Sequence, residues 1–114
     1  MRKIEKEMLR AIQEKRYWNS GNTCVEYVNA GNPHGTRSEI YLHGNHIADY
    51  WHDSKTLDVD LKTLARWSTV TTKSRLRALG ANVYTKNHVT YLGDEAICFK
   101  PYGAHTYCFE EVKQ

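Results

Sequence analysis

The chain has 114 residues and a mass of 13.3 kDa, which predicts a single domain spanning residues 1–114. Its 40% hydrophobic and 25% charged residues are typical of a globular protein and exclude collagen-like or low-complexity classes. No apolar run approaches the roughly 18 residues that cross a membrane, and the start of the chain lacks the apolar core of a secretory signal, so no membrane association is expected.

The first predicted element is an amphipathic helix over residues 3–17, because Ile4, Met8 and Ile12 recur at helical spacing. Gly21 is suited to the left-handed conformation in which a helix ends. The β-branched and aromatic side chains of residues 23–28 then predict a strand.

Residues 39–51 predict a β-hairpin, with Gly44-Asn45 as a two-residue turn. In this register His43 lies opposite His46. One face should point to the core with Ile40, Leu42 and Ile47. The opposite face should carry Tyr41, His43, His46 and Tyr50.

The second half of the chain predicts a strand at 56–61, one helical turn at 61–68 and a short basic helix at 72–79. Thr71 or Thr72 would cap that helix. Its inward residues would be Leu76 and Leu79, and its outward residues Lys73, Arg75 and Arg77.

A hairpin around Lys86-Asn87 and a last strand pair, 96–99 with 106–109, complete the prediction. In that last pair Cys98 would lie opposite Cys108, and with three cysteines in all we expect reduced thiols rather than a disulfide scaffold. The predicted fold class is α+β: an N-terminal amphipathic helix, a mostly antiparallel sheet of about five to seven strands and the basic helix.

Positive charge is concentrated in residues 61–93, which contain six basic and no acidic residues although the whole chain carries only +3. Such a block steers an acidic protein surface or a polyanion, or is simply a solvated face. The hydroxyl residues before the basic helix could present free N–H groups to an anion, or only cap the helix. The candidate binding residues are Lys62, Arg66, Trp67, Thr71, Thr72, Lys73, Arg75, Arg77 and Lys86, together with Tyr41, His43 and His46 of the first hairpin.

The opposed pair His43 and His46 could ligate a metal or perform acid–base chemistry, or merely flank a turn. No other histidine or cysteine has metal-ligand spacing, so neither a metal nor a cofactor is expected. Phosphate-binding and nucleophile motifs are also missing, so the sequence names no catalytic residues and does not favour an enzyme.

Two stretches carry a family resemblance: LHGNHIA at residues 42–48 and WSTVTTKSRLRAL at residues 67–79. They match an LHGNxIA hairpin and a WxTxTTxxRLxxL segment of a group of small uncharacterised bacteriophage proteins, which this chain resembles over about two-thirds of its length. A following hairpin of that group is matched by Val83, Lys86, Tyr91 and Leu92. Arg77 stands where the group usually has Asn. The resemblance implies a phage protein in the host cytoplasm, and it implies no particular activity.

Three functions remain open on this basis. The first is a host-takeover or anti-defence protein that inhibits a bacterial complex, such as a nuclease, a restriction or CRISPR complex or a polymerase, by direct binding. It fits the eight Tyr and three Trp residues, which are typical of interfaces. The second is a nucleic-acid-binding protein that uses the basic 62–86 segment, and the third is a small nuclease or nucleotide-handling enzyme built on His43 and His46. The partner would be a host protein or ribonucleoprotein complex, or nucleic acid, and a homodimer is left open.

Overall fold

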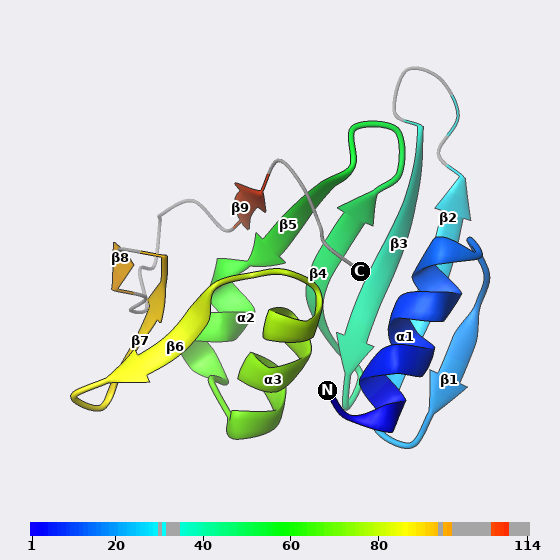
Figure 1. Cartoon of the computed structure of the whole chain (residues 1–114). Helices are drawn as coiled ribbons and strands as arrows, with labels where there is room; N and C mark the ends of the chain where they lie inside the picture. Colours follow the sequence, from blue (N-terminus) through cyan, green and yellow to red (C-terminus); the bar gives the residue numbers. More distant parts are fainter. Residues whose placement is uncertain (30, 32–34, 94, 97–105, 110–114) are drawn as a thin grey trace.

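The chain forms an α+β fold in which two antiparallel sheets are joined and partly covered by helices (Figure 1). A computed structural model describes residues 1–29, 31, 35–93, 95–96 and 106–109. The larger sheet has six strands in the order β1-β2-β3-β4-β5-β9, and the smaller has three strands in the order β6-β7-β8. The predicted fold class is therefore confirmed.

The helices are α1 (Lys3–Gln13), α2 (Leu61–Arg66) and α3 (Val70–Ala78). The larger sheet consists of β1 (Trp18–Ser20), β2 (Thr23–Asn29), β3 (Thr36–Leu42), β4 (Asn45–Trp51), β5 (Thr56–Asp60) and β9 (Thr106–Phe109). The smaller sheet consists of β6 (Val83–Lys86), β7 (Val89–Leu92) and β8 (Glu95–Ala96).

Helix α1 begins where the sequence predicts but ends four residues early, at Gln13. Lys15 adopts a left-handed φ of 56°, and the amide of Arg16 donates to the carbonyl of Ala11 at 3.1 Å. This bond closes the helix C-terminus in the manner of a Schellman motif, with lysine in the position that glycine usually occupies. The residues after this helix end form β1, a strand that the sequence did not predict.

The first hairpin turns one residue earlier than predicted. Its central residues are His43 and Gly44, with φ of 51° and 78°, as a type I′ turn requires. Tyr41 therefore pairs with His46, and a bulge shifts the register so that Ile40 pairs with Ala48. His43 and His46 are not opposed.

Because of the bulge, one residue of this hairpin lies on a different face from the one predicted. Ile40, Leu42 and Ile47 are buried in the core as predicted. Tyr50, which was expected on the opposite face with Tyr41, is 9% exposed and belongs to the core cluster.

Helix α3 starts earlier than predicted because Thr69, rather than Thr71 or Thr72, is its N-cap. The Thr69 hydroxyl accepts a hydrogen bond from the amide of Thr72 at 3.1 Å. Leu76 and Leu79 are buried as predicted, but Arg75 is only 3% exposed instead of projecting into solvent.

The last strands pair differently from the prediction. The β6–β7 hairpin turns at Asn87 and His88, both with positive φ, one residue beyond the expected turn. Strand β9 pairs with β5, where Cys108 lies opposite Asp58. The expected opposition of Cys108 to Cys98 cannot be placed, because Cys98 lies outside the described residues.

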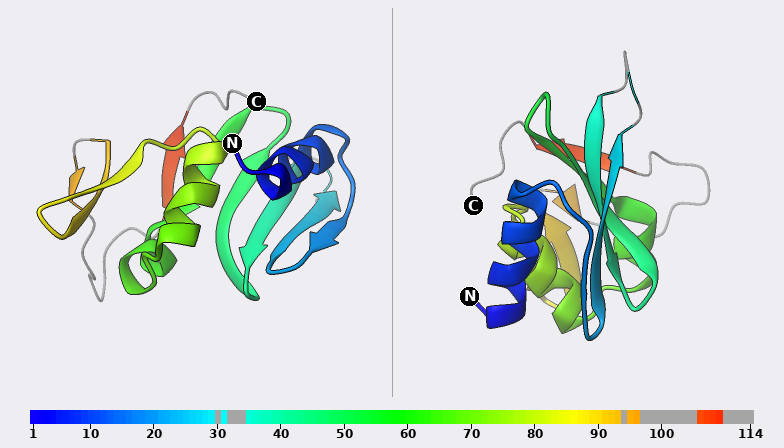
Figure 2. Two further views of the ribbon diagram at one scale, coloured as in Figure 1. Left: turned by 60° about the horizontal axis from the view of Figure 1, so that its bottom comes forward. Right: turned by 90° about the vertical axis from the view of Figure 1, so that its right-hand side faces the viewer.

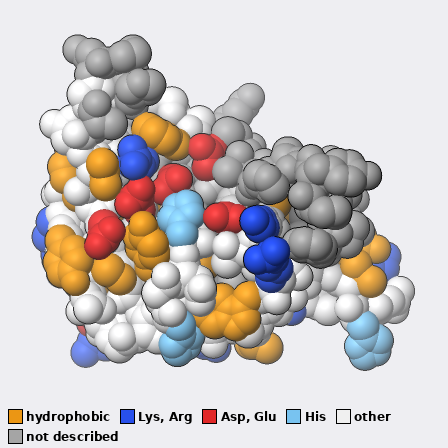
Figure 3. Space-filling view, turned by 180° about the vertical axis from the view of Figure 1, so that it is seen from behind, with side chains coloured by type: hydrophobic (Ala, Val, Ile, Leu, Met, Phe, Trp, Pro, Cys, Tyr) orange, Lys and Arg blue, Asp and Glu red, His pale blue; other side chains and the backbone are white. Residues whose placement is uncertain are grey.

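Helices α1 and α3 lie on the same face of the larger sheet (Figure 2). The core lies between these two helices and the sheet. Its largest fully buried side chains include Met8, Ile12, Ile40, Leu57 and Leu76. The other face of β2, β3 and β4 forms part of the molecular surface (Figure 3). Antiparallel sheets tolerate such one-sided solvation when the outward residues are polar.

Candidate functional site: the open face of the sheet

Four carboxylates form a row across the open face of the larger sheet. Glu26 on β2 lies opposite Glu39 on β3. Glu39 in turn lies opposite Asp49 on β4, and Asp49 opposite Asp58 on β5. Figure 3 shows acidic side chains gathered on this face around a histidine. We call these four residues the carboxylate row; they outnumber the cationic Arg37 and His46 that lie among them.

The carboxylate row is unfavourable for the sheet itself, because Cβ atoms of directly opposed residues are only about 5 Å apart and like charges there repel. Three of its members have N–H donors that offset the repulsion. Asp58, for example, accepts a hydrogen bond from the indole Nε1 of Trp51 at 2.9 Å. Glu26 is exposed and, among the described residues, has no hydrogen-bond or ion-pair partner.

His46 is the cation at the centre of the face. Its Nε2 lies 2.7 Å from Asp49 Oδ1 and its Nδ1 lies 3.3 Å from Asp60 Oδ2. The hydrogen bond to Asp49 raises the pKa of His46 to about 9, with Asp60 adding to the effect and burial opposing it. His46 is therefore protonated at neutral pH, with both ring nitrogens donating.

Tyr41 lies beside His46, with the two rings in an edge-on contact at 5.4 Å. Its hydroxyl donates to Oε1 of Glu39 at 3.1 Å. Burial and the nearby carboxylate of Glu39 raise the pKa of Tyr41 to about 12. The phenol thus stays neutral and adds no further negative charge to the face.

Arg37 shows how this surface holds a guanidinium group. Its Nε and Nη2 donate to Oε2 of Glu39 at 3.0 and 2.9 Å. The same guanidinium lies over the ring of Trp51, 5.3 Å from the ring centre. A carboxylate beside an aromatic ring is the combination that favours arginine over lysine.

The structure does not bring His43 and His46 into one site. His43 sits in the turn, where its ring contacts that of Trp67 edge-on at 5.6 Å, whereas His46 is held by two aspartates. Within the described part of the chain, no group of three or more histidine, cysteine or acidic side chains is arranged to hold a metal ion. The geometry therefore lends no support to catalysis by a histidine pair.

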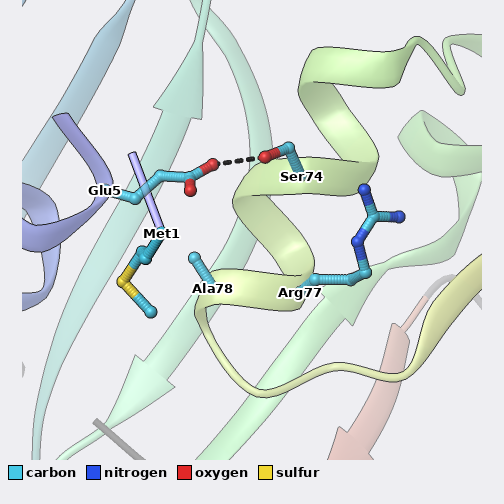
Figure 4. Close-up of a pocket in the computed structure, with 5 residues that line it drawn as sticks. All are labelled: Met1, Glu5, Ser74, Arg77 and Ala78. Carbon is cyan, nitrogen blue, oxygen red and sulfur yellow. Dashed lines mark hydrogen bonds between the residues drawn. The ribbon is translucent and has the colours of Figure 1, made fainter. Parts of the chain in front are cut away.

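One residue of the basic segment, Arg75, is buried in an ion pair inside the fold. Arg75 donates from Nη1 to the Glu5 carboxylate at 2.8 Å, and Glu5 also accepts from the Ser74 hydroxyl. Glu5, Ser74 and Arg77 line a cavity of about 230 Å³ together with Met1 and Ala78 (Figure 4). Burial alone would raise the pKa of Glu5, but the hydrogen bonds from Ser74 and Arg75 lower it below its usual value. Arg75 is thus a structural residue.

The other predicted binding residues are spread over several elements. Lys73 donates to the Thr85 hydroxyl, and Arg77 donates to the carbonyl of Val83 at 3.0 Å. Thr72 is fully buried. The remaining predicted residues are half-buried or exposed: Lys62 and Arg66 on α2, Trp67 at its C-cap, Thr71 on α3 and Lys86 on β6.

The carboxylate row was missed because its alignment depends on register. In the predicted hairpin Asp49 lies opposite Ile40, which hides the pairing of Asp49 with Glu39. Glu26 and Asp58 were visible in the sequence only as isolated polar positions of strands. His43 and Asn45 are both residue types that adopt positive φ, so the sequence alone does not decide on which side of Gly44 the turn is centred.

None of the described helices is long and apolar enough to cross a membrane. No curated protein and no solved structure matches the chain. A family model does match it, over residues 1–109, which is nearly the whole chain. The chain therefore belongs to the Kyanoviridae Gp96 protein family and is a phage protein.

Proposed function

We propose that this phage protein acts by binding a bacterial macromolecular complex and inhibiting it, with the open face of the larger sheet as the contact surface. The complex would be part of the host's defence or gene-expression machinery, such as a nuclease, a restriction or CRISPR complex or a polymerase. The observation that carries the proposal is the carboxylate row, Glu26–Glu39–Asp49–Asp58.

Placing like charges opposite one another across strands does not itself favour folding, although hydrogen bonds from Arg37, His46 and Trp51 offset the repulsion at three of the four positions. A water-facing strand surface needs polar side chains, but alternating charges would satisfy water equally well and would attract one another across the strands. Natural proteins accept locally unfavourable arrangements mainly where function needs them. The repulsion among Glu26, Glu39 and Asp49 therefore favours a role in recognition.

Aromatic side chains accompany the acidic ones. Tyr41 and Trp51 lie on the same face, half-buried, and each is fixed by a hydrogen bond to a member of the carboxylate row. Fixed aromatic rings lose little entropy on binding and are enriched among the residues that dominate interface energies. The negative field would attract a basic partner and accelerate association.

Binding of nucleic acid through the basic helix has less support. Arg75 is buried, and Lys73 and Arg77 already donate to groups of the small sheet. The open face would repel phosphates.

The test uses a tagged protein expressed in the bacterial host, with two double variants that change charge equally. Glu26→Lys/Glu39→Gln alters the open face, whereas Glu7→Lys/Glu14→Gln alters α1 and its C-cap on the covered side of the sheet. We expect the wild type and the α1 variant to capture the same host complex and to inhibit its activity. The open-face variant should lose both properties while keeping its circular-dichroism spectrum.

Equal capture and inhibition by a folded open-face variant would refute the proposal. Loss of capture in Lys73→Ala/Arg77→Ala, with the open-face variant unaffected, would move the contact surface to the basic side of the molecule.

A further inference from the structure

We infer that the occupant of the open sheet face is an arginine-bearing protein surface, with a guanidinium group bound over Glu26 and against the ring of Tyr41. This inference rests on the proposed function and specifies the chemistry of its partner. A face that joins opposed carboxylates to half-buried rings complements arginine, because guanidinium both pairs with carboxylates and stacks on aromatic groups.

The open face already holds one guanidinium group in this way. Arg37 pairs with Glu39 through two N–H groups and lies over Trp51. This arrangement occupies one carboxylate and one ring of the face. It shows that both interactions are geometrically compatible on this sheet.

Glu26 also combines a carboxylate with a nearby aromatic ring, but no guanidinium group of the described residues pairs with it. It is exposed and lies opposite Glu39, and the ring of Tyr41 is its diagonal neighbour, because Tyr41 pairs with Cys24 two residues before Glu26. Diagonal neighbours on one face are about 7–8 Å apart, within reach of an arginine that contacts both. An incoming arginine would also offset the repulsion between Glu26 and Glu39.

The carboxylate row extends over four strands, or roughly 14 Å at the usual spacing between strands. One exposed ion pair contributes little to affinity, so the face is suited to a partner that presents several arginines together. Lysine would satisfy the charge but not the stacking or the paired N–H geometry. Guanidinium selectivity therefore separates this inference from general attraction of cations.

The probes are nona-arginine and nona-lysine peptides, which carry equal charge. Titration of ¹⁵N-labelled protein in about 0.15 M salt should give saturable amide shifts on β2, β3 and β4, with nona-arginine binding at least about tenfold more tightly. Glu26→Gln should weaken nona-arginine binding about three- to fivefold. Glu7→Gln, on α1, should change it less than about twofold.

Equal affinity for the two peptides, or shifts confined to elements other than β2–β4, would overturn the inference. The proposed function would survive that result if the open-face variant still failed to capture the host complex. If the peptide binds selectively at Glu26 but the open-face variant captures the complex normally, the proposed function fails while the arginine site stands.

Discussion

Arg75 and Glu5, 70 positions apart in the chain, form an ion pair at 2.8 Å in which both side chains are only 4% exposed. The pair joins α3 to α1, and Arg75 also donates from Nε to the Thr23 hydroxyl on β2 at 3.0 Å. Charges removed from water in this way are tolerated only when each has its partner. The pair therefore fixes how both helices sit on the sheet.

Arg75→Met should lower the free energy of unfolding by about 3–5 kcal/mol, because it leaves the Glu5 carboxylate buried without its counterion. Urea denaturation followed by circular dichroism measures the loss. Arg77→Met, at an exposed residue two positions further along α3, removes a single hydrogen bond to the Val83 carbonyl and should cost no more than about 1 kcal/mol.

The double variant Glu5→Leu/Arg75→Met should recover most of that stability, because it removes both buried charges together. If Arg75→Met alone is as stable as Arg77→Met, the pair does not have the structural role assigned to it.

The first hairpin offers a test of its turn. Gly44→Ala should destabilise the protein by about 1–2 kcal/mol, since its φ of 78° is unfavourable for any residue with a Cβ. An added Cβ would meet nothing within 4 Å, so backbone conformation alone accounts for the cost. His43→Asn should be neutral or stabilising, because Asn-Gly is the preferred type I′ pair. If Asn45→Ala destabilises the protein as much as Gly44→Ala does, the turn is centred on Gly44-Asn45 instead.

The sequence was sufficient for those parts of the fold that depend on local patterns. Spacing of apolar residues predicted that Leu42, Ile47, Leu76 and Leu79 would be buried, and they are. Register was not predictable to one residue, because a left-handed His43 and the bulge near Ile40 are set by the packing of the whole sheet.

The candidate site depended on that register, and the basic helix depended on tertiary pairing. No local rule signals that Arg75 should be buried while the neighbouring basic positions stay accessible, since its partner Glu5 lies on another helix. Carboxylates on four separate strands likewise become a row only after the strands are aligned.

Stability should fall in alkaline solution because of His46. Its pKa is about 9 in the folded protein and near 6.5 when unfolded, so the folded state binds the proton more tightly. This contribution is complete below about pH 6.5 and is lost as the pH rises through about 9. With 30% of the side chain in water, we expect it to be about 1–2 kcal/mol.

His46→Gln provides the comparison. The variant should be less stable than wild type at pH 6, and the difference should shrink above pH 9, as measured by urea denaturation across that range. Parallel pH profiles for the two proteins would contradict the assigned protonation of His46.

Relief of repulsion in the carboxylate row should be measurable as a gain in stability. Glu26→Gln is expected to raise the free energy of unfolding by about 0.2–1 kcal/mol, because Glu26 lies opposite Glu39 and has no compensating partner among the described residues. The gain should shrink in about 0.5 M salt, which screens exposed charges. Glu7→Gln is the matched control and should not stabilise the protein. A stabilised Glu26→Gln that also loses its partner would show directly that the row serves binding at the expense of folding.

Nucleic acid provides the last test, because it distinguishes the two charged sides of the molecule. Wild-type protein should not shift a random DNA duplex below micromolar concentration in about 0.15 M salt, where non-specific binders have dissociation constants of about 10⁻⁴ to 10⁻⁶ M. Arg75 is buried, Lys73 and Arg77 are engaged with Thr85 and Val83, and the opposite face is acidic.

Weak binding at lower salt would still be informative. Each phosphate contact adds about 0.9 to the slope of log affinity against log salt, so Lys73→Ala/Arg77→Ala can reduce that slope by at most about two. Arg75 is left unchanged in this variant because its loss would destabilise the fold and confuse the measurement of binding. A submicromolar shift by the wild type, abolished in Lys73→Ala/Arg77→Ala, would make the basic side the functional surface and nucleic acid its ligand.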